Sequence, residues 1–210
     1  IGQGEILALL GRNGAGKTTT LKSLLNFVHP DSADIEFFGK TFEEAENEIK
    51  QKIGFVSGGV NYYAKSKIKS ITNTTKRFYN NWDDKAYLKY LELFKVDENK
   101  TPSMLSDGMK VKYSLALALS HNAELLILDE PTSGLDPVSR DELLDIFLKL
   151  SEDGITILFS THITSDLDKC ADNIIYIKNG QILAESNIDK YVQSYRVLEL
   201  NDDKAQELKD

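Results

Sequence analysis

Continuous apolar runs alternate with amphipathic segments along most of the chain. The runs at 7–10, 124–128 and 155–159 contain almost no polar residue, which is typical of parallel strands covered on both faces of a sheet. Apolar positions in the segments between them recur every three or four residues, the period of an amphipathic helix. These helices are predicted at 18–27, 108–120, 137–151 and 163–171. The alternation predicts an α/β fold.

Shorter patterns add further elements to this core. We predict strands at 34–38 and 53–56, and a polar helix at 43–52. Asn179-Gly180 separates apolar runs at 173–178 and 181–184, and this dipeptide is the strongest short signal for a β-hairpin. A segment at 187–194, an apolar stretch at 197–200 and a polar tail complete the chain.

Between residues 60 and 102 the strand signals fade and aromatic residues alternate with charged ones. Leu88, Leu91 and Phe94 have helical spacing. We interpret this stretch as a mostly helical subdomain inserted into the α/β core. Its aromatic side chains either form the core of that subdomain or line a groove for a partner helix, because exposed aromatic residues mark interfaces.

Composition narrows the classes of protein that fit. A length of 210 residues allows one large domain, or a domain with a small lobe, with a sizeable buried core. The net charge of −8 argues against a general nucleic-acid binder, which is usually basic. Cys170 is the only cysteine, so a disulfide framework or a cysteine zinc site is excluded. No apolar run approaches the roughly 18–20 residues that cross a bilayer, so we expect membrane contact only through a partner.

The turn after the first apolar run carries the strongest chemical signal. Its sequence, Gly11-Arg12-Asn13-Gly14-Ala15-Gly16-Lys17-Thr18, matches the phosphate-binding P-loop pattern G-x-x-x-x-G-K-[ST]. The glycines allow the backbone to approach a ligand, and successive N–H groups at a helix N-terminus form an anion site. Lys17 would contact the β- and γ-phosphates, and the Thr18 hydroxyl would be a ligand of Mg²⁺. The sequence therefore predicts nucleotide binding.

A second cluster follows the apolar run at 124–128, where Asp129 and Glu130 stand side by side. Phosphoryl transfer on a P-loop requires a carboxylate at the end of a neighbouring strand to hold Mg²⁺, and Asp129 fits that role. Glu130 is placed to orient and deprotonate an attacking water. Two acids in a solvated loop are the alternative, which the buried strand before them disfavours.

Leu128-Asp129-Glu130-Pro131-Thr132-Ser133-Gly134-Leu135-Asp136 resembles the Walker B and D-loop segment of ATP-binding cassette (ABC) ATPases. The resemblance covers almost the whole chain. It implies a P-loop NTPase (RecA-like) ABC ATPase core at 1–59 and 103–200, a helical subdomain at 60–102 and a C-terminal tail at 201–210. The strand that carries the family's adenine-stacking aromatic would precede Ile1, so we expect N-terminal strands to be missing.

The resemblance also implies a site shared by two subunits, each ATP lying between one P-loop and the other subunit's signature motif. Leu105-Ser106-Asp107-Gly108-Met109 stands where the family has L-S-G-G-Q, so Ser106 and Gly108 would contact the partner's γ-phosphate. His162 matches the switch histidine, which holds the γ-phosphate together with Glu130. A capping histidine at a helix start is the alternative. The resemblance also implies that Thr19 and Asp136 contact the nucleotide. The other two histidines, His29 and His121, are interpreted as structural.

Three departures from the family pattern concern the γ-phosphate. Asp107 replaces a glycine and Met109 a glutamine in the signature motif, and we suggest that Lys110 and Lys112 offset the added carboxylate. Gly58 stands where the family has the Q-loop glutamine and offers no side chain. We therefore expect slow or partner-dependent hydrolysis.

The predicted function is that of an ATP-hydrolysing subunit at the cytoplasmic face of the membrane, where it drives a separate exporter permease. Ser57-Gly58-Gly59, the Asn80–Asp84 stretch and the altered signature resemble cassettes encoded beside GntR-type regulators in Gram-positive bacteria. A soluble ABC ATPase of DNA repair or translation, and a regulatory cassette that only binds ATP, are the alternatives. A P-loop kinase is disfavoured because the sequence shows no recognisable site for a second substrate.

Overall fold

The computed structural model describes residues 1–57 and 63–194. Its sheet has the strand order β2-β3-β4-β1-β5-β6. The first five of these strands are parallel, and β6 pairs with β5 in the antiparallel sense. The strands are β1 (Ile6–Leu10), β2 (Ile53–Ser57), β3 (Leu125–Asp129), β4 (Thr156–Thr161), β5 (Asn173–Lys178) and β6 (Gln181–Asn187).

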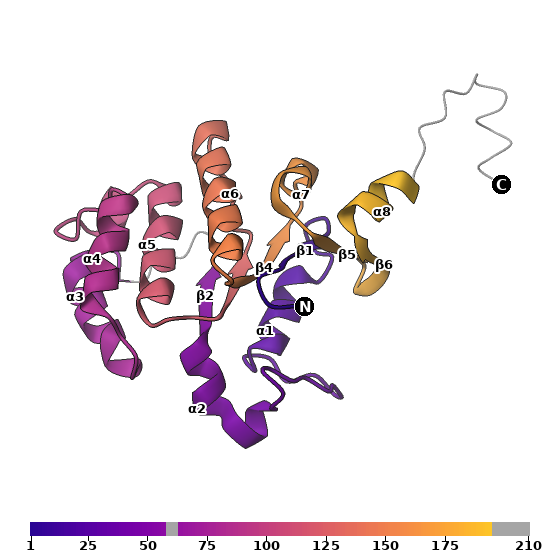
Figure 1. Cartoon of the computed structure of the whole chain (residues 1–210), viewed down its shortest axis with the longest axis horizontal. Coiled ribbons are helices and arrows are strands. Elements are labelled where there is room, and N and C mark those ends of the chain that lie inside the picture. The colour runs from indigo at the N-terminus through magenta and orange to yellow at the C-terminus, as the bar shows by residue number, and fades with distance from the viewer. Residues whose placement is uncertain (58–62, 195–210) are drawn as a thin grey trace, which may run out of the picture.

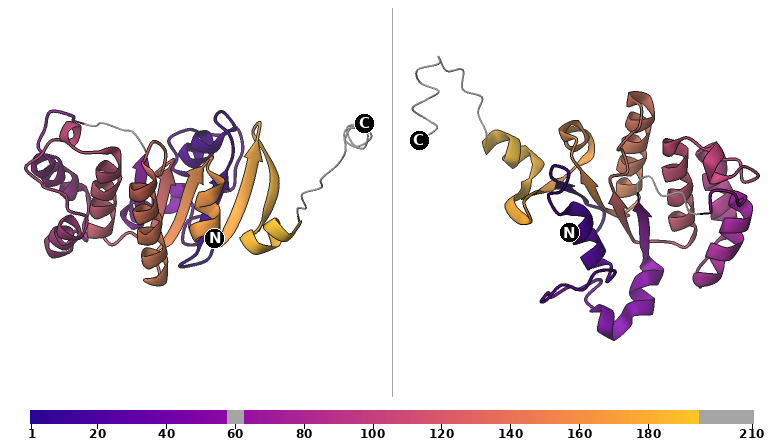
Figure 2. Two further views of the ribbon diagram at one scale, coloured as in Figure 1. Left: turned by 90° about the horizontal axis from the view of Figure 1, so that it is seen from above. Right: turned by 180° about the vertical axis from the view of Figure 1, so that it is seen from behind.

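Helices cover both faces of this sheet, as Figures 1 and 2 show. One face packs against α5 (Asp107–Ser120), α6 (Pro137–Glu152) and α7 (Thr164–Cys170). The other face packs against α1 (Lys17–Leu24) and α2 (Phe42–Lys52). The prediction of an α/β fold with a largely parallel sheet is therefore confirmed. A last helix, α8 (Ile188–Ser194), follows β6 at the far end of the molecule from the helical subdomain.

The described residues of the segment between β2 and α5 form helices joined by turns and loops, and no strand. It contains α3 (Ile68–Thr75), α4 (Asp84–Leu93) and two single 3₁₀ turns, η1 (Lys76–Phe78) and η2 (Pro102–Met104). Its core is partly polar: the Thr72 hydroxyl hydrogen-bonds the hydroxyls of Tyr87 at 2.8 Å and Tyr113 at 2.9 Å. Burial raises the pKa of Tyr87 to about 12, so this hydroxyl stays protonated.

Some aromatic residues of this segment form its core, as one interpretation predicts, whereas others are exposed; that the exposed ones line a groove for a partner helix stays a prediction. Tyr87 and Phe94 are buried, and Trp82 and Tyr90 pack against the core. Tyr63 and Phe78 are instead more than two thirds exposed. Tyr62 lies outside the described residues.

Two predicted elements differ from the structure. No strand forms at 34–38; Phe37 makes one isolated bridge to Lys40, around a turn whose residues Phe38 and Gly39 have φ of +55° and +74°. A strand needs a partner edge, and among the described residues none runs beside this segment. The first helix ends at Leu24 and does not reach residue 27, because Asn26 turns into the left-handed region with φ +59°.

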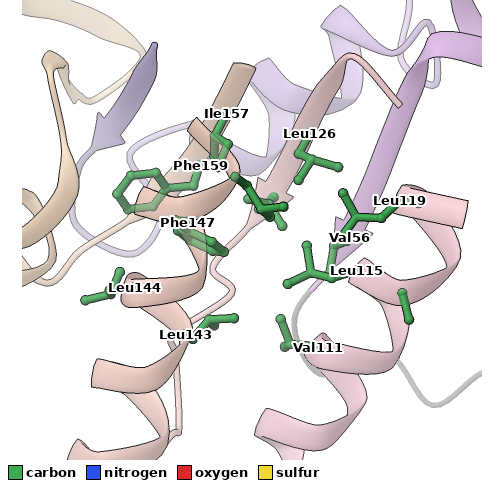
Figure 3. Close-up of a cluster of buried hydrophobic side chains, with 14 of the residues drawn as sticks. Val56, Val111, Leu115, Leu119, Leu126, Leu143, Leu144, Phe147, Ile157 and Phe159 are labelled. Atoms are coloured by element: carbon green, nitrogen blue, oxygen red, sulfur yellow. The ribbon is translucent and has the colours of Figure 1, made fainter. Parts of the chain in front are cut away.

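The core between the sheet and helices α5 and α6 is closely packed. Figure 3 shows Phe147 and Leu143 of α6 and Leu115 of α5 directed toward Leu126 and Phe159 of the sheet. All five side chains are essentially inaccessible to solvent. No helix within 1–57 and 63–194 has the length and apolar character that a bilayer crossing requires.

Candidate functional site

The P-loop occupies the turn from β1 into α1, at the carboxyl edge of the sheet. Gly14 and Gly16 have φ of +80° and +112°, a region that side-chain-bearing residues rarely adopt. Gly11 is required for a different reason: a Cβ there would lie 2.6 Å from the carbonyl oxygen of Ile177 on β5. The loop therefore has its shape because glycine stands at these three positions.

Lys17 is the first residue of α1 and is 5% exposed. Its ammonium group donates to the carbonyl oxygen of Gly11 at 2.6 Å and to that of Arg12 at 3.3 Å. It also forms an ion pair with Glu130 Oε1 at 2.8 Å. A full positive charge is thus fixed at the centre of the loop, between backbone oxygens and one carboxylate.

Glu130 joins this lysine to His162. Its Oε2 lies 2.7 Å from His162 Nδ1, so one carboxylate links the P-loop lysine to the predicted switch histidine. The backbone of Glu130 is in the left-handed region, with φ +50°, and its N–H donates to the Ser160 hydroxyl at 2.9 Å. Lys17, Glu130 and His162 therefore form one hydrogen-bonded chain.

Asp129 lies at the end of β3 and contacts two hydroxyl groups. Its Oδ1 accepts hydrogen bonds from Ser160 Oγ at 2.7 Å and from Thr18 Oγ1 at 3.1 Å. A hydroxyl and a carboxylate held together beside phosphate-binding groups match the way Mg²⁺ is bound, since Mg²⁺ takes few protein ligands together with waters and phosphate oxygens. The donor set of Thr18 and Asp129 therefore fits a magnesium ion.

The strand order explains why these residues meet. β4 lies between β1 and β3, so His162, which follows β4, stands between the P-loop and the two carboxylates. The carboxyl ends of parallel strands share one edge of a sheet, which is where α/β proteins bind ligands. Asp129 pairs in register with Ser160, and Leu10 with Thr161.

Two adjoining grooves open beside the P-loop. The first, of about 340 Å³, is lined by Gly16 to Thr19, Glu130, Ser133 and His162 as well as by Asn13 and Gly14. The second, of about 520 Å³, shares Asn13, Gly14 and His162 with the first and extends to Arg12, Ala15 and residues 176–179. A larger pocket lies across the α1 face of the sheet, away from this chemistry. All eight residues predicted from Arg12 to Thr19 therefore line one or both of the grooves beside the P-loop.

Four predicted nucleotide contacts line neither groove: Gly11, at the start of the P-loop, and Ser106, Gly108 and Asp136, which lie outside it. Ser106 is the N-cap of α5, where its hydroxyl accepts from the Met109 N–H at 3.3 Å, and Gly108 lies in the first turn of the same helix. Asp136 caps α6 by accepting from the Val138 and Ser139 N–H groups. Hydrogen bonds from Ser139 are the largest of the causes that lower the pKa of Asp136.

The suggestion that two lysines offset Asp107 is right for one of them. Lys110 forms an ion pair with Asp107 at 2.7 Å, one helical turn away. Lys112 is instead paired with Glu142 of α6 at 2.6 Å. The other notable departure from the family pattern, Gly58, lies outside the described residues.

Several residues of the site were missed by the sequence reasoning. Ser160 contacts both Asp129 and Glu130, Ser133 lines the phosphate groove, and Tyr176 lines the second groove. Ser160 could have been found, because it stands two residues before the candidate switch histidine at the end of a strand. Nothing local to Ser133 or Tyr176 indicates a role, because strand pairing alone brings Tyr176 beside Leu10.

His121, interpreted as structural, packs inside the protein, whereas His29 is exposed and its interpretation stays a prediction. His121 is buried, stacks on Tyr79 with ring centroids 3.7 Å apart and hydrogen-bonds the Gln51 carbonyl through Nδ1 at 3.1 Å. Burial lowers the pKa of His121, so its neutral form is favoured. Cys170 is a buried free thiol on α7, and burial raises its pKa to about 12.

Comparison with known proteins extends this picture. The sequence model of the ABC transporter family matches residues 1–133. The chain is 35% identical over 206 residues to a bacitracin transport ATP-binding protein of Bacillus licheniformis, covering 95% of this chain and 67% of that protein. Among solved structures, an ATP-binding subunit of an ABC transporter superposes with a TM-score of 0.80 at 26% identity, covering 91% of this chain and 82% of that one. A dimeric bacterial ABC transporter cassette superposes with a TM-score of 0.74 at 25% identity, covering 90% and 87%.

Proposed function

The chain belongs to the ABC transporter family, and we propose that it is the ATP-binding and ATP-hydrolysing subunit of a bacterial exporter. The observation that carries this proposal is the hydrogen-bonded chain from Lys17 through Glu130 to His162. In this arrangement the lysine that would bind phosphate, the proposed general base and the residue that would orient the base contact one another directly. A cassette that only bound ATP would not need the last two groups.

In the proposed mechanism the residues from Gly11 to Thr19 hold the nucleotide phosphates through backbone N–H groups and the Lys17 ammonium. Thr18 and Asp129 would hold Mg²⁺. The ion, when bound, neutralises the charge that develops on the phosphate oxygens. Ser160 keeps the Asp129 carboxylate in place by donating to the same oxygen as Thr18 does.

Glu130 is the proposed general base. A γ-phosphate bound at the P-loop would compete for the Lys17 ammonium, which is paired with Glu130. The carboxylate would then be free to accept a proton from water, while His162 would keep it oriented through the 2.7 Å contact. Glu130 is thus held inactive until its lysine partner is taken over by phosphate.

We propose that a second cassette completes the site. Ser106 and Gly108 lie at the N-terminus of α5, where Ser106 is exposed and Gly108 is buried, and neither lines a groove of its own chain. The dimeric cassette with the same fold supports an arrangement in which these groups reach the partner's nucleotide. The Lys110 ion pair would reduce the repulsion between Asp107 and that phosphate. Asp136, which caps α6, would lie near the same interface.

The proposed role in transport rests on the similarity to a protein named for bacitracin transport. The match covers about two thirds of the length of that protein. A separate membrane permease would carry the substrate and provide the only membrane contact, at its cytoplasmic face. Residues 1–59 and 103–200 would form the nucleotide-binding core, 60–102 the helical subdomain facing the permease, and 201–210 a tail. The named relative argues against roles in DNA repair or translation. The finer proposal is a Gram-positive exporter beside a GntR-type regulator, such as the phenol-soluble modulin exporter.

The test is Glu130→Gln, which keeps the shape of the side chain but removes the base. We expect ATP affinity to be retained, turnover to fall by about 10²–10⁴-fold, and ATP-bound dimers to accumulate in light scattering. Glu142→Gln is the matched control, since Glu142 is an exposed glutamate of α6 that pairs with Lys112. Wild-type turnover in Glu130→Gln would contradict the assignment of the base.

The glycine at position 58 leads to a separate hypothesis about the rate of ATP hydrolysis. Because no side chain stands at the Q-loop position, we propose that hydrolysis by the isolated cassette is slow or depends on a partner. Steady-state turnover of the purified chain should rise when the co-purifying membrane protein is added. Turnover at ordinary ABC rates without any partner would refute this hypothesis.

A further inference from the structure

Asp166, on α7, is a carboxylate with no solvent exposure, and the proposed mechanism does not use it. Its Oδ1 accepts from Arg140 Nε at 2.5 Å. Its Oδ2 accepts from the hydroxyls of Thr132 at 2.7 Å and Thr161 at 3.0 Å. Asp166 and its three partners come from four different segments: α7, α6, the loop after β3 and the end of β4.

The two threonines are the informative partners because each adjoins a residue of the proposed site. Thr132 follows Glu130 by two positions and is 1% exposed. Thr161 immediately precedes His162 and is also buried, and its hydroxyl accepts the Ile163 N–H at 3.0 Å. One carboxylate oxygen therefore binds the segment that carries the base and the segment that carries its orienting histidine.

A simple role in packing α6 against α7 explains less of this arrangement. The two helices are already joined at the surface by ion pairs of Lys169 with Asp141 and Asp145. A buried ion pair is weak support for stability, because desolvation of the charges offsets much of their attraction. An apolar pair would hold two helices equally well but would remove the acceptor to which both threonine hydroxyls donate.

The backbone of Glu130 adds a reason to hold this loop. A non-glycine residue with φ +50° is strained, and such strain persists only where the surrounding contacts fix it. Within the site, the Glu130 side chain is held by its contacts with Lys17 and His162. Outside the site, the loop that carries Glu130 is held by the hydrogen bond from Thr132 to Asp166. The contacts with Lys17 and His162 would change during turnover, whereas the hydrogen bond of Thr132 need not.

We propose that Asp166 is a positioning residue for ATP hydrolysis, which fixes the Glu130 loop relative to His162 through Thr132 and Thr161. This inference rests on the proposed function. Arg140 supplies the countercharge that allows the carboxylate to remain buried, and its Nη2 also donates to Ser165 at 2.5 Å. Asp166 touches no part of the phosphate groove, so it should affect the rate of hydrolysis and not the affinity for nucleotide.

The decisive variants are Thr132→Val and Thr132→Ser. Valine has nearly the shape of threonine but no hydroxyl, whereas serine keeps the hydroxyl that binds Asp166. We expect Thr132→Val to lower kcat by about 5- to 100-fold, the scale of a misplacement approaching 1 Å, with less than a twofold change in the dissociation constant of a fluorescent ATP analogue. Thr132→Ser should restore most of the rate. Asp166→Asn should behave as Thr132→Val does or more severely.

Two comparisons separate positioning from stability. Asp141→Asn removes an α6–α7 ion pair at the surface and should leave kcat unchanged. In a His162→Ala background, Thr132→Val should reduce kcat by much less than it does in the wild type, because the pair it aligns is already broken. Equal effects of Thr132→Val in both backgrounds, or a wild-type kcat in Thr132→Val, would overturn the inference.

Failure of the role proposed for Asp166 can be distinguished from failure of the proposed function. If the wild type hydrolyses ATP and Glu130→Gln does not, but Thr132→Val matches the wild type, only the role of Asp166 is refuted. If the wild type shows no hydrolysis with its membrane partner present, the proposed function fails and this inference fails with it. A parallel loss of kcat and nucleotide affinity in Thr132→Val would also overturn it.

Discussion

Gly54, in the middle of β2, allows α5 to pack directly on the sheet. A Cβ built at this position would lie 2.5 Å from the Ala118 Cβ and 2.7 Å from Leu126 Cδ2. The first distance is 0.9 Å short of the 3.4 Å at which ordinary van der Waals contact begins. Its φ is not positive, so the requirement for glycine is one of space and not of backbone conformation. In the folded protein, Gly54→Ala therefore tests packing and not backbone strain.

The expected decrease in the free energy of unfolding follows from the positions of the atoms that the new Cβ would meet. Overpacking a close-packed core costs about 1–3 kcal/mol, and the upper half of that range applies because Leu126 is fully buried and Ala118 is on a helix held against the sheet. Replacing glycine also stabilises by about 0.4–1 kcal/mol through the unfolded chain. The net loss is about 1–2.6 kcal/mol, which lowers the unfolding temperature by about 2–10 °C for a chain of this size.

Differential scanning calorimetry of Gly54→Ala is the assay, with Gly108→Ala as the control. A Cβ at Gly108 meets its nearest neighbour, Ser139 Cβ, at 3.5 Å, and alanine favours a helix over glycine by up to about 1 kcal/mol. Gly108→Ala should therefore unfold at the wild-type temperature or above. Ala118→Gly added to Gly54→Ala should recover part of the loss by removing the shorter contact. A Gly54→Ala protein as stable as the wild type would refute the packing argument.

Three further predictions concern charge, hydrogen bonding and metal. The lowered pKa of buried His121 means that the unfolded chain takes up a proton first, near its ordinary pKa of about 6.5. Stability should therefore fall as the pH drops from about 7 toward 5.5, and less so in His121→Phe; equal slopes in thermal unfolding would contradict this. Ser160→Ala leaves the Glu130 N–H unpaired and should cost about 1–3 kcal/mol in urea unfolding; an unchanged midpoint would contradict it. Chelation with EDTA should abolish hydrolysis while nucleotide stays bound at the P-loop, and unchanged turnover would exclude the magnesium role proposed for Asp129.

Much of the fold could be predicted because its signals are local in sequence. Strand and helix periodicity located β1, β3, β4 and the helices after them, and Asn179-Gly180 located the hairpin, whose turn residues have φ of +52° and +75°. The P-loop also depends on neighbouring residues alone, so its glycines and Lys17 could be assigned before any contact was known. Local patterns failed at 34–38, because a strand forms only where another strand pairs with it.

The arrangement of the candidate site was decided by tertiary structure. No local pattern indicates that β4 enters the sheet between β1 and β3, and only the family resemblance led us to expect His162 beside Glu130; the strand order places His162 against Glu130 and Ser160 against Asp129. The contacts of Asp166 with Thr132 and Arg140 join segments 34 and 26 residues apart, so no short pattern reveals them.

The sequence by itself therefore determined which groups could bind phosphate and act as acids or bases, since residue type fixes that chemistry. The tertiary structure decided which of those groups meet: Glu130 is paired with Lys17 and His162, while Ser106 and Gly108 do not line the phosphate groove of their own chain. The physical reason is that side-chain chemistry belongs to each residue, whereas proximity between distant residues depends on strand order and helix packing.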